Sequence, residues 1–414
     1  MKTPMRDDAA HRAEQVARAA YGRLLAILVA KDGDIELAED CLAEAFAQAL
    51  SRWPETGVPD RPEGWLLTVA RNQRRDVRRS AAYRRSDAFD ETLHDGASGP
   101  APLPDDDDIP DRRLALLFVC AHPAIDPAVR TQLMLQLVLG FDAAQVGRAF
   151  AIPPTTMAQR LVRAKHRIRD ARIPFVIPAR EQMASRLTPV LEAIYGAYAI
   201  DFLVAGIEPR ESLAAEAQYL ATVLADLMPN EPEALGLAAM LSLSLARRSA
   251  RGSEEEFVPL EAQDASLWDA KLIARGERYL EQANALGQVG RFQLEAAIQS
   301  VHCARAASGV TDWAALGNLH AALLRFAPTL GARVALAAAV GRAQGAQAGL
   351  LALDAIEDDA MLRFQPAWAT RAHLLAEAGL PDAAAEAFTR AMGLTTDPRL
   401  RRYLERRQAQ CLGE

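Results

Sequence analysis

Two clusters of basic side chains give the sequence its clearest chemical signal, because guanidinium and ammonium groups pair with phosphates. Residues 61–85 carry eight arginines against two acidic residues, and residues 145–172 carry seven basic residues against one acidic residue. Each cluster has a net charge of +6, whereas the whole chain has a net charge of −7. Two basic clusters in an acidic chain favour two surfaces that face nucleic acid. The alternative is two solvated helix faces that happen to be basic.

The residue patterns of common catalytic sites are missing. The sequence has no P-loop, no GxGxxG after a strand, no HExxH and no GxSxG. Cys120 and His122 could ligate a metal, but other ligands are not near them in sequence, so we interpret Cys120 as a buried thiol. We interpret His302 and Cys303 as structural, and residues 105–108 as solvated linker. We therefore predict no catalytic residue, no metal, no cofactor and no enzymatic activity.

Composition predicts an all-α protein of two or three domains. The chain has 414 residues, half of them apolar and only 6% aromatic, and Ala and Leu dominate. No apolar run is long enough to span a membrane, and the N-terminal residues show no apolar signal segment. The four scattered cysteines fit reduced thiols. We expect a cytoplasmic protein without membrane contact.

Four blocks follow one another along the chain. Residues 10–85 are predicted to form a helical bundle, and residues 86–110 an acidic flexible linker rich in Pro, Gly and Asp. Residues 111–178 are predicted to form a second, smaller helical bundle. Residues 183–414 continue as Ala/Leu-rich helix after helix.

The first bundle contains a helix that Asp34 can cap and that runs to about Arg52. Glu36, Asp40 and Glu44 are spaced by four on one of its faces, and like charges at this spacing weaken an isolated helix. A basic protein partner would account for such a row, and a solvated acidic face accounts for it equally well.

The next predicted helix follows a Pro-rich turn over residues 53–59 and begins near Pro62. Its apolar side is predicted to face inward, with Trp65 in the core and Val77 at the far end. The polar side is predicted to face outward and to contact the DNA backbone. The candidate residues on that side are Arg71, Asn72, Arg74, Arg75, Arg78 and Arg79.

The second bundle contains a pattern typical of a helix-turn-helix. Asp142 and Gln145 form a capping-box pattern before a short helix, and Pro154 fits the first turn of a basic helix. The turn between them holds Ala151 where Gly is usual, and another kind of helical hairpin is the alternative. The basic helix buries one apolar face and turns its polar side outward. The candidate DNA contacts are Thr155, Thr156, Gln159, Arg160, Arg163, Lys165 and Arg167.

Together these segments resemble bacterial sigma factors of the sigma-70 family. Residues 38–46 (AEDCLAEAF) are similar to the core helix of conserved region 2, and residues 65–72 (WLLTVARN) to the helix that serves promoter melting and −10 recognition. Residues 131–170 are similar to region 4, which reads the −35 element. Regions 2 and 4 joined by a loose linker are the layout of the extracytoplasmic-function (ECF) type.

Further segments resemble the ECF subgroup that has a long C-terminal helical extension. They are residues 114–123 and 153–165, with Trp268-Asp269, Ile273-Ala274 and Asp312-Trp313 in the extension. The chain departs from the subgroup's pattern at Ala43, Ala121 and residues 195–201.

The resemblance implies partners and roles for individual residues. The first bundle would bind the β′ clamp helices of core RNA polymerase, and region 4 would bind the β flap and the −35 major groove of promoter DNA. A loop between Trp53 and Pro62 would capture an unstacked −10 base. The implied polymerase-binding residues are Asp40, Glu44, Phe46 and Gln48.

The C-terminal half contains one segment with tetratricopeptide-type spacing. A stack of helical hairpins most often binds protein, so a regulatory protein is a further candidate partner. The alternative is a packed helical cap without a ligand. The residues at the repeat positions are Trp368, Leu375, Gly379, Ala384, Phe388 and Ala391.

Three other functions compete with a sigma factor. A stand-alone helix-turn-helix regulator with a helical sensor would not need the first basic bundle and its acidic face. A tetratricopeptide-type scaffold predicts no salt-dependent affinity for DNA. An enzyme is the most distant alternative.

Overall fold

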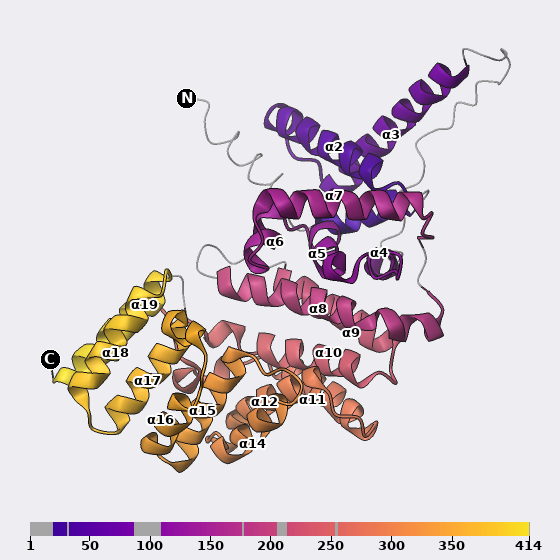
Figure 1. The fold of residues 1–414 in the computed structure, drawn as a ribbon. Coiled ribbons are helices and arrows are strands. Elements are labelled where there is room, and N and C mark those ends of the chain that lie inside the picture. The colour runs from indigo at the N-terminus through magenta and orange to yellow at the C-terminus, as the bar shows by residue number, and fades with distance from the viewer. Residues whose placement is uncertain are drawn as a thin grey trace. The chain divides into compact units, whose positions relative to one another are not determined.

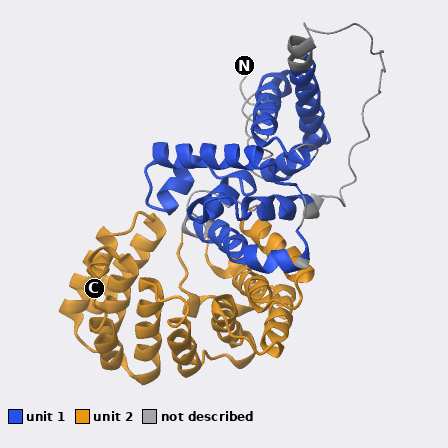
Figure 2. Cartoon of the chain, turned by 45° about the vertical axis from the view of Figure 1, so that its right-hand side comes forward, with its two compact units in different colours: residues 1–200 blue, residues 201–414 orange. Residues whose placement is uncertain are grey.

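The computed structural model describes residues 20–30, 33–86, 109–175, 178–204, 213–252 and 256–413. These residues form helices and no β-strand, which confirms the predicted all-α class (Figure 1). The chain divides into two compact units, residues 1–200 and 201–414 (Figure 2). No helix within the described ranges is both long enough and apolar enough to cross a bilayer. Most of the predicted linker, residues 87–108, lies outside the described residues.

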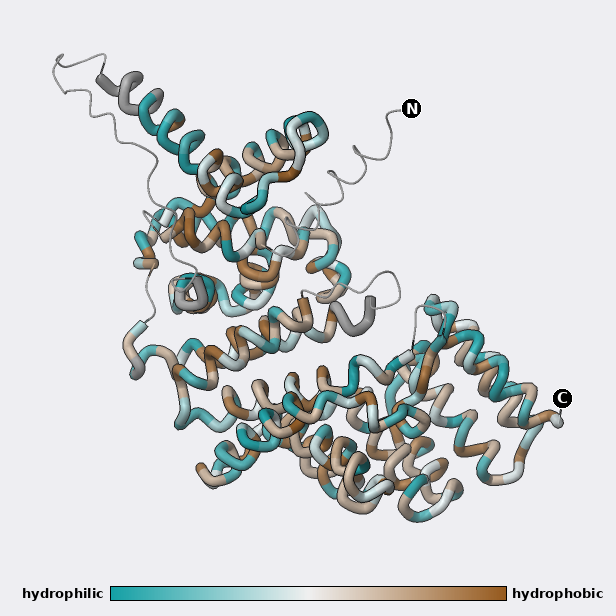
Figure 3. Tube along the Cα trace, turned by 180° about the vertical axis from the view of Figure 1, so that it is seen from behind, coloured by the Kyte–Doolittle hydropathy of each residue, from teal (hydrophilic) through white to brown (hydrophobic). Residues whose placement is uncertain are grey.

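The first bundle of unit 1 combines helical residues 20–29 with α2 (Ile35–Thr56) and α3 (Pro62–Ser86). Asp34 caps α2 as predicted, because its carboxylate accepts a hydrogen bond from the Leu37 backbone N–H at 3.1 Å. Helix α2 continues about one turn beyond the predicted end and contains Pro54 in its last turn. The outer turns of α3 are predominantly hydrophilic (Figure 3). The buried stripe of α2 consists of Ile35, Ala38, Cys41, Leu42, Ala45, Ala49 and Trp53.

The second bundle of unit 1 is built around an apolar core. Arg186 donates a hydrogen bond at 3.5 Å to the carbonyl of Phe118, one of its fully buried residues. Helix α8, which contains Arg186, also lies mostly in unit 1. The helices are α4 (Ile109–Cys120), α5 (Pro127–Leu137), α6 (Ala143–Ala149), α7 (Pro154–Asp170) and α8 (Arg180–Val204).

Unit 2 is a succession of helices that pack mainly on their neighbours in sequence. Glycine permits close crossings between them, since a Cβ on Gly236 would lie 2.5 Å from the Gln293 backbone nitrogen. The helices are α9 (Leu213–Leu227), α10 (Pro232–Leu245), α11 (Ala270–Ala285), α12 (Arg291–Cys303), α13 (Arg305–Ser308), α14 (Trp313–Leu323), α15 (Leu330–Gln344), α16 (Ala346–Asp354), α17 (Gln365–Glu377), α18 (Pro381–Gly393) and α19 (Pro398–Leu412). Short 3-10 turns are η2 (Arg248–Ala250), η3 (Leu260–Ala262), η4 (Ala265–Leu267) and η5 (Asp359–Arg363).

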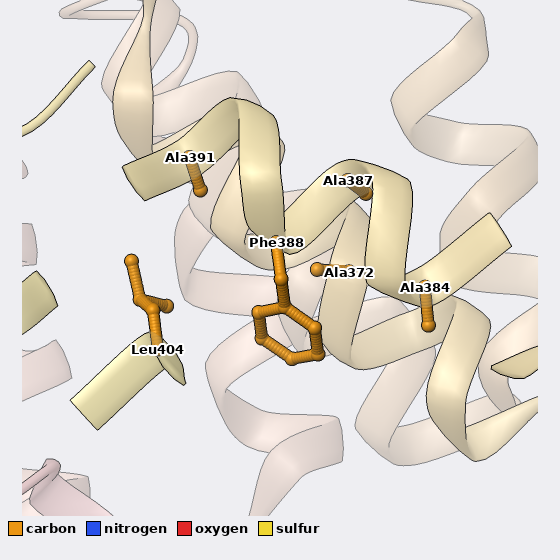
Figure 4. Packing of buried hydrophobic residues seen from close by; sticks show 6 residues of the cluster. All are labelled: Ala372, Ala384, Ala387, Phe388, Ala391 and Leu404. Carbon is orange, nitrogen blue, oxygen red and sulfur yellow. The ribbon is translucent and has the colours of Figure 1, made fainter. Parts of the chain in front are cut away.

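The last three helices of unit 2 share one core. Phe388 of α18 is fully buried and points between α17 and α19, where it is surrounded by small side chains (Figure 4). Alanines bring these helices close enough for one aromatic ring to fill the space. The buried residues of this cluster are Ala372, Ala384, Ala387, Phe388, Ala391 and Leu404.

Candidate nucleic-acid interface

Helix α7 presents a polar row because its opposite face is buried. Met157, Leu161, Ala164 and Ile168 are buried, as the sequence predicted. Residues four apart share one side of a helix, so the candidate contacts form a continuous exposed row along the first three turns. Its fully exposed members are Thr155, Gln159, Arg160, Arg163 and Arg167, and Thr156 is half-buried.

The turn before α7 fixes the direction of that row. The predicted capping box is present, because the Gln145 N–H donates to Asp142 at 2.7 Å and the Asp142 N–H donates to the Gln145 side chain at 2.9 Å. Helix α6 and the turn cross so closely that a Cβ on Gly147 would lie 2.7 Å from the Ile152 carbonyl oxygen. Ala151 has a φ of 53°, the left-handed conformation that usually requires glycine.

The second half of α7 is paired with carboxylates of α2. Lys165 Nζ lies 2.8 Å from Glu39 Oε2, and the Lys165 side chain is only 11% exposed. His166 Nε2 lies 2.7 Å from Glu36 Oε1, and Arg169 forms an ion pair with the other oxygen of Glu36. Lys165, predicted to contact DNA, is therefore held inside the protein in this arrangement.

One further contact lies within the first bundle and one joins it to the second. Within the first bundle, the Tyr21 hydroxyl donates to Glu39 at 3.3 Å, and its burial, followed by the Glu39 charge, raises the pKa of Tyr21. Gly22 packs against the backbone that follows α5, where a Cβ would lie 1.7 Å from the Val138 carbonyl oxygen. A side chain at position 22 is therefore incompatible with this arrangement.

Helix α3 carries the other predicted basic surface, and the structure corrects part of it. Arg74 does not face outward: it is 5% exposed, and its guanidinium donates to the Leu28 carbonyl. Position 74 continues the stripe of Leu66 and Ala70, and the long side chain reaches a carbonyl in the last turn of the helix of residues 20–29. Val77 was predicted inward but is 41% exposed.

The remaining candidate residues of α3 form a smaller basic surface. Arg71 is half-buried, and burial together with the nearby Arg112 charge lowers its pKa. Trp65 packs edge-on against buried Trp53 with ring centroids 5.6 Å apart, which fixes α3 on α2. The exposed candidates on this surface are Asn72, Arg75, Arg78 and Arg79.

The predicted polymerase-binding residues lie on the outer side of α2. Asp40 and Glu44 are exposed, and Phe46 and Gln48 are half-buried. The Gln48 amide donates to Glu44 at 3.2 Å. The acidic row of α2 is thus divided. Glu36 pairs with α7, whereas the Asp40 and Glu44 carboxylates are exposed on the outer side.

The Cys120–His122 pair lies between α4 and α5. Cys120 is fully buried, and burial raises the pKa of its thiol. The Nδ1 atom of His122 accepts a hydrogen bond from the Ala124 N–H at 3.1 Å. Within the described ranges, no cluster of three or more His, Cys, Asp or Glu side chains could hold a metal ion.

Comparisons with known protein families match two segments of the chain. The family "Sigma-70 region 2" matches residues 16–84, and a family of unknown function (DUF6596) matches residues 186–284. An uncharacterized protein of Rhizobium meliloti is 32% identical over 372 residues, which cover 88% of this chain and 87% of that protein. The chain belongs to the family of this Rhizobium protein.

A second similarity covers a smaller share of the chain. The "Probable ECF RNA polymerase sigma factor SigI" of Mycobacterium tuberculosis is 30% identical over 159 residues, 37% of this chain and 53% of that protein. The chain thus spans about half of that relative. No solved structure matches the chain. The region 2 match and this relative support a sigma factor of the sigma-70 family, with region 2 formed by α2, α3 and the residues before them.

Proposed function

We propose that the chain is an ECF-type sigma factor that binds core RNA polymerase and directs it to promoters for transcription initiation. The observation that carries this proposal is the exposed polar row of α7, presented by a capped helix-turn-helix-like pair in the same compact unit as region 2. The helical extension, residues 183–414, is proposed to serve regulation or protein interaction.

In this proposal the two basic helices read two promoter elements. The row of α7 enters the −35 major groove, with Thr155 and Gln159 at base edges and Arg160 and Arg163 at bases or phosphates. The exposed residues of α3, with Asn72 among them, face the −10 region. Arg74 supports α3 from inside and has no direct contact with DNA.

The outer side of α2 is proposed to bind the polymerase. Asp40 and Glu44 are exposed carboxylates that can meet basic side chains of the β′ clamp helices, and Phe46 and Gln48 lie beside them. The β flap is the proposed partner of region 4. Because these surfaces differ, loss of DNA contact and loss of polymerase contact can be separated by mutation.

The pairing between α2 and α7 places a condition on this function. Lys165 reaches a phosphate only after it leaves Glu39, so the two bundles must separate, at least locally, when promoter DNA binds. The more exposed pair of Arg169 with Glu36 contributes about 0–1 kcal/mol, so a polyanion such as DNA competes with it readily, whereas the Lys165–Glu39 pair is largely buried.

Run-off transcription tests the proposal directly. Purified protein is added to sigma-free bacterial core polymerase, with the DNA upstream of the protein's own gene as template. We expect a discrete transcript that depends on the protein. Tight promoter binding without a transcript would instead indicate a stand-alone helix-turn-helix regulator. A protein that binds neither DNA nor core polymerase, as full chain or as residues 1–182, would contradict the proposal.

A further inference from the structure

Residues 256–263 of unit 2, which we call the strap, cross several helices that are distant from them in sequence. The Glu256 carboxylate lies 3.6 Å from Arg406 of α19. Glu261, five residues later, pairs with Arg342 of α15 at 3.1 Å. The strap ends in the 3-10 turn η3 and its two carboxylates reach α19 and α15, so it bridges two helices of the repeat-like unit.

Arginines hold the strap through its backbone as well as its side chains. Arg305 of α13 donates to the Glu261 carbonyl, and to the Gln263 carbonyl at 2.8 Å. Its guanidinium lies 4.9 Å from the centroid of the Trp268 ring, which fixes its position. Because carbonyl oxygens occur in every peptide, Arg305 recognises the backbone of the turn η3 and of its C-cap Gln263 rather than particular side chains.

Arg342 is the central contact for a carboxylate on this surface. It pairs with Glu377 at 3.1 Å in addition to the strap's Glu261. Its guanidinium lies 5.0 Å from the centroid of the Trp313 ring. The Trp313 ring and the Glu377 carboxylate orient the Arg342 guanidinium, so that it can bind a second carboxylate.

An aromatic contact completes the recognition of the strap. The Phe257 ring lies 5.3 Å from Tyr403 of α19. Tyr403 in turn contacts His373, whose ring packs edge-on against the buried Phe388. The Phe257 ring is therefore connected to the core of the last three helices through the Tyr403 and His373 rings.

The strap behaves as a surface-bound segment rather than as part of the core. Phe257, Val258, Pro259 and Leu260 are only half-buried, although all four are apolar, and the carboxylate residues at the ends are exposed. Pro259 has extended backbone angles (φ −64°, ψ 152°). A segment held at the surface by ion pairs, carbonyls and one ring can be replaced by another peptide that carries the same groups.

We propose that the face of α13, α15 and α19 is a binding site for an acidic segment of a partner protein, and that the strap occupies it in cis. The partner segment would carry a carboxylate next to an aromatic residue and a second carboxylate about five residues from the first. Its binding requires release of the strap. This proposal concerns the extension alone and does not depend on the promoter function.

A peptide-binding experiment tests the site without polymerase or DNA, so its failure is distinct from failure of the sigma proposal. The probe is a fluorescein-labelled peptide with the sequence of residues 256–264, EFVPLEAQD, measured by anisotropy. The proteins are the full wild-type chain, a strap variant (Phe257→Ser with Glu261→Gln), and the strap variant that also carries Arg342→Glu. The control peptide has the same two substitutions as the strap variant.

We expect the strap variant to bind the probe at least ten-fold more tightly than wild type, and Arg342→Glu to remove this gain. The control peptide should bind none of the proteins measurably. Circular dichroism verifies that the helices remain; if the double variant unfolds, Glu261→Gln alone should give a smaller gain of about three-fold, because one charge-assisted contact is lost. A folded strap variant that binds no better than wild type, or binding that survives Arg342→Glu, would overturn the proposal. A dimer formed by strap exchange, detected by light scattering, would also overturn it, because the occupant would then be a second copy.

Discussion

Helices α3 and α7 carry similar charge but use their basic residues differently. Helix α7 buries four apolar side chains and exposes its basic residues except Lys165. Helix α3 buries an arginine, Arg74, which binds the helix of residues 20–29. The comparison shows that net charge identifies a basic helix, whereas the burial register decides which of its arginines can reach a ligand.

The two helices also differ in their acidic surroundings. Arg75, Arg78 and Arg79 of α3 are exposed, while the second half of α7 faces Glu36 and Glu39. The first half of α7 remains open. Promoter-specific transcription is therefore expected to depend most strongly on the first half of α7. Four groups of variants test this comparison of the two helices.

The largest effect is expected from Arg160→Ala combined with Arg163→Ala. Each lost base or phosphate contact costs about 1–3 kcal/mol, so promoter-specific run-off transcription should fall about 100-fold, while binding to core polymerase remains. The matched control is Arg325→Ala with Arg363→Ala, which removes two exposed arginines from unit 2. Loss of core binding in the first variant would contradict the assignment of α7 to DNA.

Arg74→Ala should lower stability rather than contact with DNA. The substitution leaves the Leu28 carbonyl without this donor and removes a buried side chain, so we expect the free energy of unfolding to fall by about 2–3 kcal/mol in urea titrations. The neighbouring exposed Arg75→Ala should change it by less than about 0.5 kcal/mol and weaken DNA binding instead. Equal stability of the two variants would place Arg74 on the outer surface.

Glu36→Gln with Glu39→Gln should free the second half of α7. Without these carboxylates Lys165 and Arg169 can turn to phosphates, so affinity for promoter DNA in gel shifts should rise about five-fold at low salt. The control Asp40→Asn with Glu44→Gln removes two charges from the same helix. It should leave DNA affinity nearly unchanged and reduce affinity for core polymerase. Equal DNA affinities for the two variants would show that general charge, and not the pairing, controls binding.

The smallest effect concerns the turn before α7. Ala151→Gly removes about 1–2 kcal/mol of strain from the left-handed backbone conformation. It also gives the unfolded chain more conformational entropy, which lowers the free energy of unfolding by about 0.4–1 kcal/mol. We expect a net stabilisation of about 0.5 kcal/mol, measured as a higher midpoint of urea unfolding. Ala158→Gly, inside α7, should destabilise the protein. A lower midpoint for Ala151→Gly would mean that the turn differs in solution.

Local patterns predicted much of unit 1 from the sequence. The cap at Asp34, the capping box at Asp142 and the buried stripe of α7 depend on residues within a few positions of one another, and all three are confirmed. The burial of Arg74 and the pairing of Lys165 could not be predicted in this way. Their partners, Leu28 and Glu39, are 46 and 126 residues away, so only the tertiary arrangement reveals them.

The strap was also beyond sequence analysis, because its residues lack the periodicity of a helix or a strand. Glu256, Phe257 and Glu261 lie in the block that the sequence predicted as helix after helix, and only the structure reveals their partners on α15 and α19. Small residues in a repeat-like pattern predicted the helices of unit 2 but not the segment that crosses them.

The path of the strap has a consequence for how unit 2 folds. A stack in which each helix packs on its neighbours unfolds from its ends, because the terminal helix has only one neighbour. The strap joins a segment before α11 to α19, so the last helix gains an attachment that is distant in sequence. Loss of the strap should convert one cooperative transition into gradual fraying from the C-terminal helix, which hydrogen exchange resolves residue by residue. Release of a short surface segment would thus determine whether the stack melts as a whole or helix by helix.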